Sequence, residues 1–267
     1  TGHTPSEEQQ AEAAERRRLE SDLRQAIAQG RMTVHFQPRV ILATGMPTGA
    51  EALLRWPHRK RGLIAPSAFL PYAERSGLIT RLGGWVLDAA CREARGWPAG
   101  TRLAVNVAAR QISDGVLLHQ VGQALAAQAL PAEQLELELP EHGVLDIAED
   151  TLLTLAALRD TGVGIVLDDY GAGQTSLAAL RRLPLSSVKL DRSLVRGLPG
   201  AIDDAALARA IIGAAHALGL AVIAEGVETE GQRRFLAEAG CDEAQGHLFG
   251  GAMSAAALRP FLATPPG

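Results

Sequence analysis

A regular alternation of short apolar segments with helix-length amphipathic ones begins after Gly30 and limits the folds open to this chain. The short segments are rich in Val, Ile and Leu, which is typical of buried strands. We predict eight strands, at residues 33–40, 50–56, 102–107, 135–139, 164–170, 187–191, 221–227 and 243–249. Helical stretches such as 151–162 and 206–220 separate most of them. This order predicts an α/β fold and favours a (β/α)₈ barrel, with a doubly wound parallel sheet as the alternative.

The connection between the first two predicted strands is the exception to this pattern. It contains about ten residues, whereas a crossover between parallel strands needs a dozen or more. We therefore predict that the first pair is antiparallel. The expected fold is a modified TIM (β/α)₈ barrel with one antiparallel strand.

Length and charge narrow the classes of function. The 267 residues suffice for one such barrel or for two small domains. A net charge of −4 and a pI near 6.0 give no basic field, so we expect no binding of DNA or RNA duplexes. Cys91 and Cys241 are too few for a disulfide framework, and no apolar run is long enough to span a bilayer. We expect a cytoplasmic domain.

Residues 4–29 are predicted to form one charged helix. Thr4 suits the N-cap and Pro5 the first helical position. An apolar stripe begins only in its second half, at Leu19, Leu23 and Ile27. We predict a linker helix at residues 1–20, the main domain at 21–262 and a tail at 263–267. Because the first residue is Thr1 and not Met, we also expect a longer multidomain parent.

Polar side chains recur on every predicted strand from the second onward. These residues are Glu51, Asn106, Glu138, Asp168 with Asp169, Lys189, Glu225 and Gln245. In a barrel, side chains near the carboxyl ends of the strands converge on one mouth, where such folds keep their chemistry. Glu51 fits less well, because an antiparallel first pair would reverse the strand that carries it. A solvent-facing Glu or a snorkelling Lys is the ordinary alternative for each residue alone.

The adjacent Asp168 and Asp169 follow a buried run, and a surface turn is their simplest explanation. In a shared mouth, however, two carboxylates about 4 Å apart repel each other by roughly 4 kcal/mol at an effective dielectric of 20. Either some carboxyls are protonated or a cation is present. Oxygen donors suit Mg²⁺ or Mn²⁺, and adjacent aspartates can bridge two ions for phosphoryl displacement. Lys189 would then orient water or stabilise phosphoryl charge, and the Arg55 guanidinium suits a phosphate as well as it suits an exposed surface.

Several motifs with the same order and spacing resemble those of the EAL-domain cyclic-di-GMP phosphodiesterases, over about residues 20–262. The motifs are "EALLRW" (51–56), "PSAFLPYAERSGLI" (66–79), "VNV" (105–107), "ELPE" (138–141), "DDYGAG" (168–173), "KLDRSLV" (189–195), "AEGVET" (224–229) and "QGHLFG" (245–250). The resemblance implies the EAL fold, a TIM-like barrel with one antiparallel strand. It also implies hydrolysis of cyclic-di-GMP to linear 5′-pGpG with two Mg²⁺ or Mn²⁺ ions, and inhibition by Ca²⁺.

The resemblance also implies a role for each matching residue. The implied metal ligands are Glu51, Asn106, Glu138, Asp168, Asp169 and Glu225, with Asp168 bridging the ions. Lys189 matches a lysine that contacts the nucleophilic water, Gln245 and Glu225 match residues that position water, and Glu141 matches a glutamate that holds the loop after the aspartate pair. Arg55 matches a phosphate contact, Asp191 and Glu228 match residues near guanine, and Gln37 is a further substrate contact.

Family members often form homodimers near the loop after Asp169, and the charged N-terminal helix resembles a linker from a GGDEF or sensory domain. Three residues depart from the family pattern: Pro140 stands for Thr, Ala108 for Ser and Gln174 for an aromatic residue. The effect of these three residues on loop closure, dimer coupling and turnover rate does not follow from the sequence. The alternative function is a catalytically silent or regulated cyclic-di-GMP receptor. Such receptors typically lose metal ligands or the lysine, and this chain keeps them, so we expect an active enzyme.

Overall fold

The computed structural model describes residues 7–143, 148–171 and 177–263. Nine strands occur in this part of the chain. They are β1 (Thr33–Ile41), β2 (Pro47–His58), β3 (Gly62–Ile64), β4 (Arg102–Asn106), β5 (Leu135–Pro140), β6 (Gly164–Tyr170), β7 (Ser187–Leu190), β8 (Ala221–Ala224) and β9 (Glu243–Gln245). The eight predicted strands are therefore all present, and β3 is an addition that the sequence pattern did not indicate.

Helices fill most of the connections after β3. The α-helices are α1 (Glu7–Ala28), α2 (Pro66–Arg75), α3 (Leu78–Ala94), α4 (Ala109–Ser113), α5 (Leu117–Gln128), α6 (Glu149–Asp160), α7 (Leu177–Leu180), α8 (Arg192–Arg196), α9 (Ile202–Ala217), α10 (Glu230–Glu238) and α11 (Ala255–Ala263). Two short 3₁₀ turns, η1 (Ala132–Gln134) and η2 (Glu141–Gly143), flank β5. Among the residues described, no helix has the length and apolar character needed to cross a membrane.

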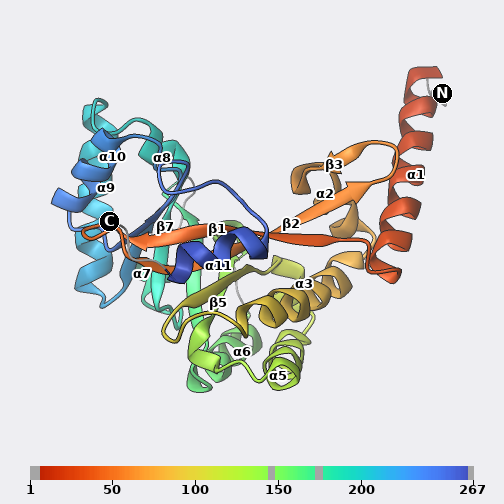
Figure 1. The fold of residues 1–267 in the computed structure, drawn as a ribbon, viewed down its shortest axis with the longest axis horizontal. Helices are drawn as coiled ribbons and strands as arrows, with labels where there is room; N and C mark the ends of the chain where they lie inside the picture. The colour runs from red at the N-terminus through yellow and green to blue at the C-terminus, as the bar shows by residue number, and fades with distance from the viewer. Residues whose placement is uncertain (1–6, 144–147, 172–176, 264–267) are drawn as a thin grey trace.

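Eight of the strands close into a ring. Neighbours follow the order β1-β9-β8-β7-β6-β5-β4-β2, and β2 pairs again with β1, while β3 extends β2 as a hairpin. β1 is antiparallel to both of its neighbours, and the other pairs of the ring are parallel. Figure 1 shows this barrel with α3, α5 and α6 along one side and α9 and α10 at one end. The closed ring confirms the modified TIM barrel and excludes the doubly wound sheet.

The reversed strand is β1, and this corrects the expectation for Glu51. β2 runs parallel to β4, so the carboxyl half of β2 points to the same mouth as the other strands. Glu51 therefore keeps the orientation that a site at the mouth requires. The short connection predicts one reversal, but it does not say which of the two strands is reversed.

Alternation along the strands separates the core from the barrel interior. On β5, Leu135, Leu137 and Leu139 are fully buried in the apolar layer between the strands and helices. The intervening Glu136 and Glu138 are also buried and make polar contacts with other strands. Because successive side chains of a strand point to opposite faces, these two glutamates face the inside of the barrel.

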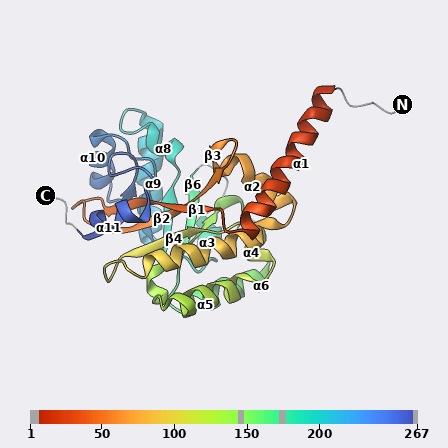
Figure 2. The ribbon, with the colours of Figure 1, turned by 45° about the vertical axis from the view of Figure 1, so that its right-hand side comes forward.

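A second apolar cluster holds α1 against the barrel. Leu19, Leu23 and Ile27 are buried, as predicted, and belong to one cluster with Trp56 of β2 and Phe69 of α2. Figures 1 and 2 show that the amino-terminal half of α1 projects away from the barrel. The predicted helix start at Thr4 and Pro5 lies outside the described residues. The proposed linker boundary at residue 20 stays a prediction.

Strands β8 and β9 end earlier than predicted, at Ala224 and Gln245 instead of 227 and 249. Gly226 adopts a left-handed φ of +73°, which turns the chain away from the sheet. After β9, a Cβ at Gly246 would lie 2.1 Å from the carbonyl oxygen of Val227, so the two loops pack backbone to backbone. Glu225 therefore lies directly after its strand, at the mouth of the barrel.

Candidate active site

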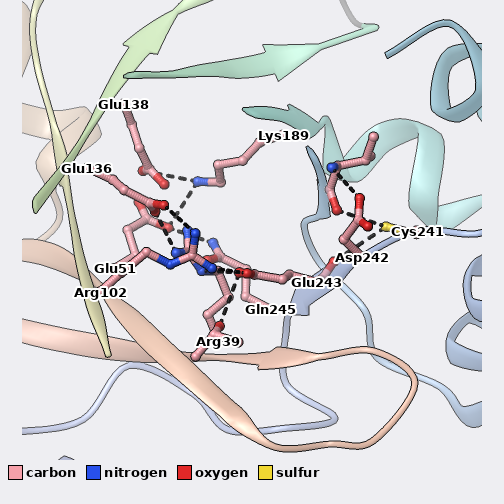
Figure 3. Close-up of polar contacts among 12 residues, drawn as sticks. Arg39, Glu51, Arg102, Glu136, Glu138, Lys189, Cys241, Asp242, Glu243 and Gln245 are labelled. Atoms are coloured by element: carbon pink, nitrogen blue, oxygen red, sulfur yellow. Dashed lines mark hydrogen bonds and ion pairs between the residues drawn. The ribbon is translucent and has the colours of Figure 1, made fainter. Parts of the chain in front are cut away.

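Six of the predicted site residues meet inside the carboxyl end of the barrel, each from a different strand. Glu51 comes from β2, Asn106 from β4, Glu138 from β5, Asp168 from β6, Lys189 from β7 and Gln245 from β9. Figure 3 shows Glu51, Glu138, Lys189 and Gln245 pointing toward one another. The sequence-based prediction of a shared mouth is thus confirmed for the placement of these side chains.

The Lys189 ammonium is the centre of this group. Its Nζ lies 3.2 Å from Glu51 Oε2, 3.1 Å from Glu138 Oε2 and 3.2 Å from Asp168 Oδ1. The side chain is 1% exposed. Burial would lower the pKa of Lys189, but Glu138 and Glu51 raise it well above its ordinary value. Lys189 is therefore a permanent positive charge among carboxylates.

The pKa values of two of these carboxylates shift in opposite directions. Burial would raise the pKa of Glu51, but Lys189 and hydrogen bonds from Gln245 Nε2 (2.5 Å) and Asn106 Nδ2 (2.6 Å) hold it below its usual value. Burial and repulsion by Glu51 raise the pKa of Glu138 well above its usual value. Its Oε1 atom is buried and has no hydrogen-bond partner among the described residues. One ammonium does not compensate for all the carboxylates of this cluster.

A second acidic group adjoins the first. Carboxylate oxygens of Asp168, Asp169 and Glu225 lie within 4.8 Å of one another. Burial and then repulsion by Asp168 raise the pKa of Asp169 to about 6. Burial raises the pKa of Glu225 to about 7 despite the opposing charge of Lys189. Both carboxyls would ionise more readily next to a cation.

Backbone strain fixes the aspartate pair. Asp169 has a left-handed φ of +58°, and its N–H donates to Asp168 Oδ1 at 3.0 Å. A non-glycine residue seldom adopts this conformation, and such strain concentrates at functional sites. The turn directs the two neighbouring carboxylates to the mouth together. The surface-turn alternative for these two residues is therefore incomplete, because the turn is also part of the acidic cluster.

This donor set fits a divalent cation. The candidate ligand groups are carboxylates with one amide, and hard cations such as Mg²⁺ and Mn²⁺ prefer such oxygen donors. Glu138 Oε1 is buried without a hydrogen-bond partner among the described residues, so this oxygen is free to act as a metal ligand. The carboxylates of Asp168, Asp169 and Glu225 are close enough to share one ion.

The residues predicted to contact substrate have other partners in this structure. Arg55 donates to the carbonyl oxygen of Leu54 at 2.9 Å, and Gln37 donates to that of Gly250 at 3.3 Å. Asp191 caps α8 by accepting from the Ser193 N–H at 2.8 Å. Glu228 is exposed near the end of the loop between β8 and α10. Contact with a substrate would require new side-chain partners for Arg55 and Gln37.

An apolar cavity of about 370 Å³ opens beside the acidic cluster. Asn106, Asp168 and Asp169 line one side, and Leu53, Leu54, Pro66, Leu70 and Ile79 are among its apolar residues. Two of the departures from the family pattern, Ala108 and Pro140, also line this cavity. Glu141 follows Pro140 in η2 and is 5% exposed. The third departure, Gln174, lies outside the described residues.

Sequence reasoning missed a layer of charged residues beneath this site. Arg39 of β1 forms ion pairs with Glu136 (Nη2–Oε2, 2.5 Å) and Glu243 (Nε–Oε2, 2.7 Å). Arg102 of β4 pairs with Glu136 at 3.1 Å (Nη1–Oε1) and also contacts Glu243. The spacing along the strands could have indicated this layer. Glu136 precedes Glu138 and Glu243 precedes Gln245 by two residues, and side chains two residues apart on a strand share a face.

Comparison with known protein families and structures gives consistent matches. The family model described as "EAL domain" matches residues 20–252. A bifunctional diguanylate cyclase/cyclic di-GMP phosphodiesterase, MucR of Pseudomonas aeruginosa, is 43% identical over 93% of this chain and 37% of its own length. The cyclic di-GMP phosphodiesterase NbdA of the same organism is 41% identical over 94% of this chain and 32% of its own length. The chain therefore spans about a third of the length of these curated relatives.

Solved structures have the same fold. The structure titled "PaMucR Phosphodiesterase, c-di-GMP complex" has a TM-score of 0.86 and 43% identity, and covers 90% of this chain and 99% of its own. The EAL enzyme Bd1971 in its cGMP-bound form has a TM-score of 0.89 and 26% identity, and covers 95% of this chain and 71% of its own.

Proposed function

The chain belongs to the EAL-domain family, and from this premise we propose that it is a metal-dependent phosphodiesterase that hydrolyses cyclic-di-GMP to linear 5′-pGpG. One observation supports this proposal most directly. The groups expected to hold metal and to position water converge on the mouth of one barrel, around the Lys189 ammonium. Two relatives at 43% and 41% identity bear the names of cyclic di-GMP phosphodiesterases.

Two ions, Mg²⁺ or Mn²⁺, are proposed to bind this donor set. Glu51, Asn106, Glu138 and Asp168 would hold the first, and Asp168, Asp169 and Glu225 the second. Bound divalent ions supply a deprotonated water at neutral pH and stabilise charge on phosphoryl oxygens. The raised pKa values of Glu138, Asp169 and Glu225 support this assignment, because a cation would replace the protons that burial favours there.

The chain's own residues would each perform a defined task in this reaction. Lys189 would hold the attacking water and oppose the negative charge that develops on the phosphoryl oxygens. Gln245 would fix the Glu51 carboxylate, to which it donates at 2.5 Å. Arg55 would bind a phosphate of the substrate through its planar fork. Asp191 and Glu228 are proposed to contact the guanine bases and Gln37 another part of the substrate, while Glu141 would hold the loop after the aspartate pair.

The apolar cavity beside Asp168 and Asp169 would take an aromatic base. Its volume of about 370 Å³ and its leucine side chains suit the flat, apolar face of an aromatic ring. With one base in the cavity, the phosphate that is joined to it through the ribose would lie at the acidic cluster. This placement would hold the scissile bond close to Lys189.

A receptor that binds cyclic-di-GMP without cleaving it is the second candidate. The described structure favours the enzyme, because all six proposed metal ligands and Lys189 are present. A third possibility is a regulated enzyme. In that case the domain can catalyse the reaction but is held inactive by other parts of a longer protein.

The decisive experiment incubates the protein with cyclic-di-GMP and Mg²⁺ or Mn²⁺ and follows 5′-pGpG by chromatography. We expect product with either ion and none with Glu51→Ala. In Ca²⁺ we expect binding of the dinucleotide without turnover, because Ca²⁺ is larger and takes more ligands at longer distances. Dinucleotide binding without product in Mg²⁺ and in Mn²⁺ would instead identify a receptor.

Three further proposals concern the setting of the domain. Cys91 and Cys241 are both buried free thiols, which suits the reducing cytoplasm. A homodimer formed near the loop after Asp169, whose residues 172–176 lie outside the described chain, is proposed from the family resemblance. The name of MucR as a diguanylate cyclase as well as a phosphodiesterase supports a parent protein with a GGDEF or sensory domain. Light scattering of the isolated domain, with and without cyclic-di-GMP, would test the dimer.

A further inference from the structure

The buried guanidinium of Arg39 joins two strands that carry site residues. Arg39 is 1% exposed and contacts Glu136 of β5 and Glu243 of β9 through different nitrogen atoms. Neither glutamate belongs to the proposed metal site. Figure 3 shows Arg39, Glu136, Glu243 and Arg102 grouped beside the cluster of Glu51, Glu138 and Lys189. Arg39 therefore bridges two strands inside the barrel, and Arg102 contacts the same two glutamates from β4.

The register of the strands places this contact directly below the site. Arg39 is the backbone partner of Gln245 in the antiparallel β1–β9 pair, so both side chains lie on the inner face. Glu136 and Glu243 precede Glu138 and Gln245 by two residues, and each pair shares the inner face of its strand. A shift of either lower glutamate would therefore move the site residue next above it.

Charge distinguishes this lower layer from the site above. Arg39 and Arg102 oppose Glu136 and Glu243, so two positive charges face two negative ones. The site above it has Glu51, Glu138 and Asp168 around the single charge of Lys189. The charges of the lower layer balance one another, so this layer needs no metal ion.

Stability alone gives a poor account of such a layer. Replacing a buried ion pair with apolar residues of similar size is often neutral or stabilising, so a buried pair is weak support for a stabilising role. What an apolar replacement would lack is direction, because the guanidinium fork sets the position of each carboxylate that it binds. The direction matters here because both carboxylates adjoin site residues.

We propose that Arg39 is a positioning residue, which ties β5 to β9 beneath the mouth and thereby holds Glu138 and Gln245 where the site requires them. This inference rests on the proposed function for its catalytic consequence. Arg39 itself contacts neither substrate nor reacting atoms. Its effect passes through Glu136 and Glu243.

Arg39→Lys tests the proposal, because lysine keeps the charge but has a single nitrogen that cannot hold both glutamates in the same geometry. Three quantities are measured: the Mn²⁺ dissociation constant of metal-free protein, kcat with KM for cyclic-di-GMP, and the thermal midpoint. We expect Mn²⁺ affinity or kcat to fall by about 10–100-fold, the range typical of residues that orient metal ligands. KM should stay unchanged, because the proposed base and phosphate contacts lie elsewhere.

Ser187→Ala is the matched control. Ser187 is 4% exposed and precedes Lys189 by two residues on β7, so it occupies the same layer outside the charged network. We expect its Mn²⁺ affinity and kcat to equal those of the wild type. If Arg39→Lys does not fold, Glu243→Gln replaces it, since the amide keeps the shape and removes the ion pair.

Wild-type Mn²⁺ affinity and kcat in Arg39→Lys would overturn the proposal, even if its thermal midpoint falls, because a purely structural role predicts that result. Equal losses in Ser187→Ala would overturn it as well, by showing that any change in this layer disturbs the site. Absence of turnover in the wild type would count against the proposed function alone. The Mn²⁺ affinities would then still decide the role of Arg39.

Discussion

The Lys189 ammonium contacts carboxylates from β2, β5 and β6, and its chemical role differs from theirs. We expect Lys189→Met to lower kcat and kcat/KM by about 10²–10³, as is typical when one group that stabilises transition-state charge is lost. KM should change little. Mn²⁺ affinity should rise, because removal of the positive charge leaves three carboxylates without compensation. Steady-state kinetics and Mn²⁺ titration measure the two effects.

Asp168→Asn is the contrasting variant for this prediction. It should weaken Mn²⁺ binding, and excess Mn²⁺ should partly restore turnover. Rescue of Lys189→Met by excess metal, or a loss of metal affinity in that variant, would contradict the role assigned to the lysine.

Glu225 gives a pH-dependent prediction for the metal-free protein. Its pKa is raised from 4.5 to about 7, chiefly by burial. At a pH between 4.5 and about 7, Glu225 keeps its proton in the folded chain and has lost it in the unfolded chain. The destabilisation from this carboxyl therefore grows as the pH rises from about 4.5 to 7 and stays constant above it. In EDTA, Glu225→Gln should gain stability over the wild type across this window, as measured by urea unfolding at pH 5 and pH 7.5.

Mn²⁺ should reverse this ranking. A metal binds the deprotonated carboxylate, so the wild type should be the more stable protein at pH 7.5 when Mn²⁺ is present. A constant difference between the two proteins from pH 5 to pH 7.5 in EDTA would show that Glu225 has an ordinary pKa.

Sequence reasoning at this scale found the residues at the mouth and missed those beneath it. Glu51, Glu138 and Lys189 stand out because each is a charged residue in an apolar strand. Glu136 has the same property, but the partner that explains it, Arg39, is 97 residues away on the reversed strand. No local pattern links the two, since their contact exists only after β1 has closed the ring.

At the scale of elements, α1 is attached by a small set of side chains. Leu23 is fully buried in the cluster with Trp56 and Phe69. We expect Leu23→Ala to cost about 3 kcal/mol of unfolding free energy, which is within the range for buried leucines. At about 2–4 °C per kcal/mol, the thermal midpoint should fall by roughly 6–12 °C.

Arg24→Ala is the neighbouring control. Arg24 is 60% exposed and pairs with Glu20 at 3.3 Å on the same helix, and such surface pairs contribute little. Differential scanning calorimetry should separate the two variants clearly. Equal midpoints would mean that α1 is not held by its apolar stripe.

The elements themselves were largely predictable, and their ends were less so. Most of the barrel strands follow from apolar runs, since strands in the barrel are buried on both faces, whereas β9 has only three residues, Glu243–Gln245, of which one is apolar. β3 has three residues, Gly62–Ile64, and forms only as a hairpin on β2, so no periodicity could indicate it. The early end of β8 depends on the left-handed Gly226, whose conformation depends on the loop around it.

At the scale of the whole molecule, the unbalanced charge in the mouth links folding to metal. A ligand that binds only the folded chain stabilises it by about 2.7 kcal/mol at a concentration of 100 times its dissociation constant. Mn²⁺ at that concentration should raise the thermal midpoint by roughly 5–10 °C. Asp168→Asn should show a smaller rise at the same Mn²⁺ concentration. Equal shifts in the two proteins would place the ion elsewhere.

The reversal of β1 also decides where the chain enters the barrel. Thr33 at the start of β1 lies opposite Arg55, near the mouth, whereas the first strand of an all-parallel barrel would start at the opposite end. α1 therefore joins the barrel on the side of the mouth and not at the base, and its amino-terminal half projects away from the barrel. In a fusion protein, a domain attached before α1 would lie on the side of the mouth, and a domain attached before a parallel first strand would lie on the side of the base. One reversed strand thus sets the geometry available for joining this barrel to other domains.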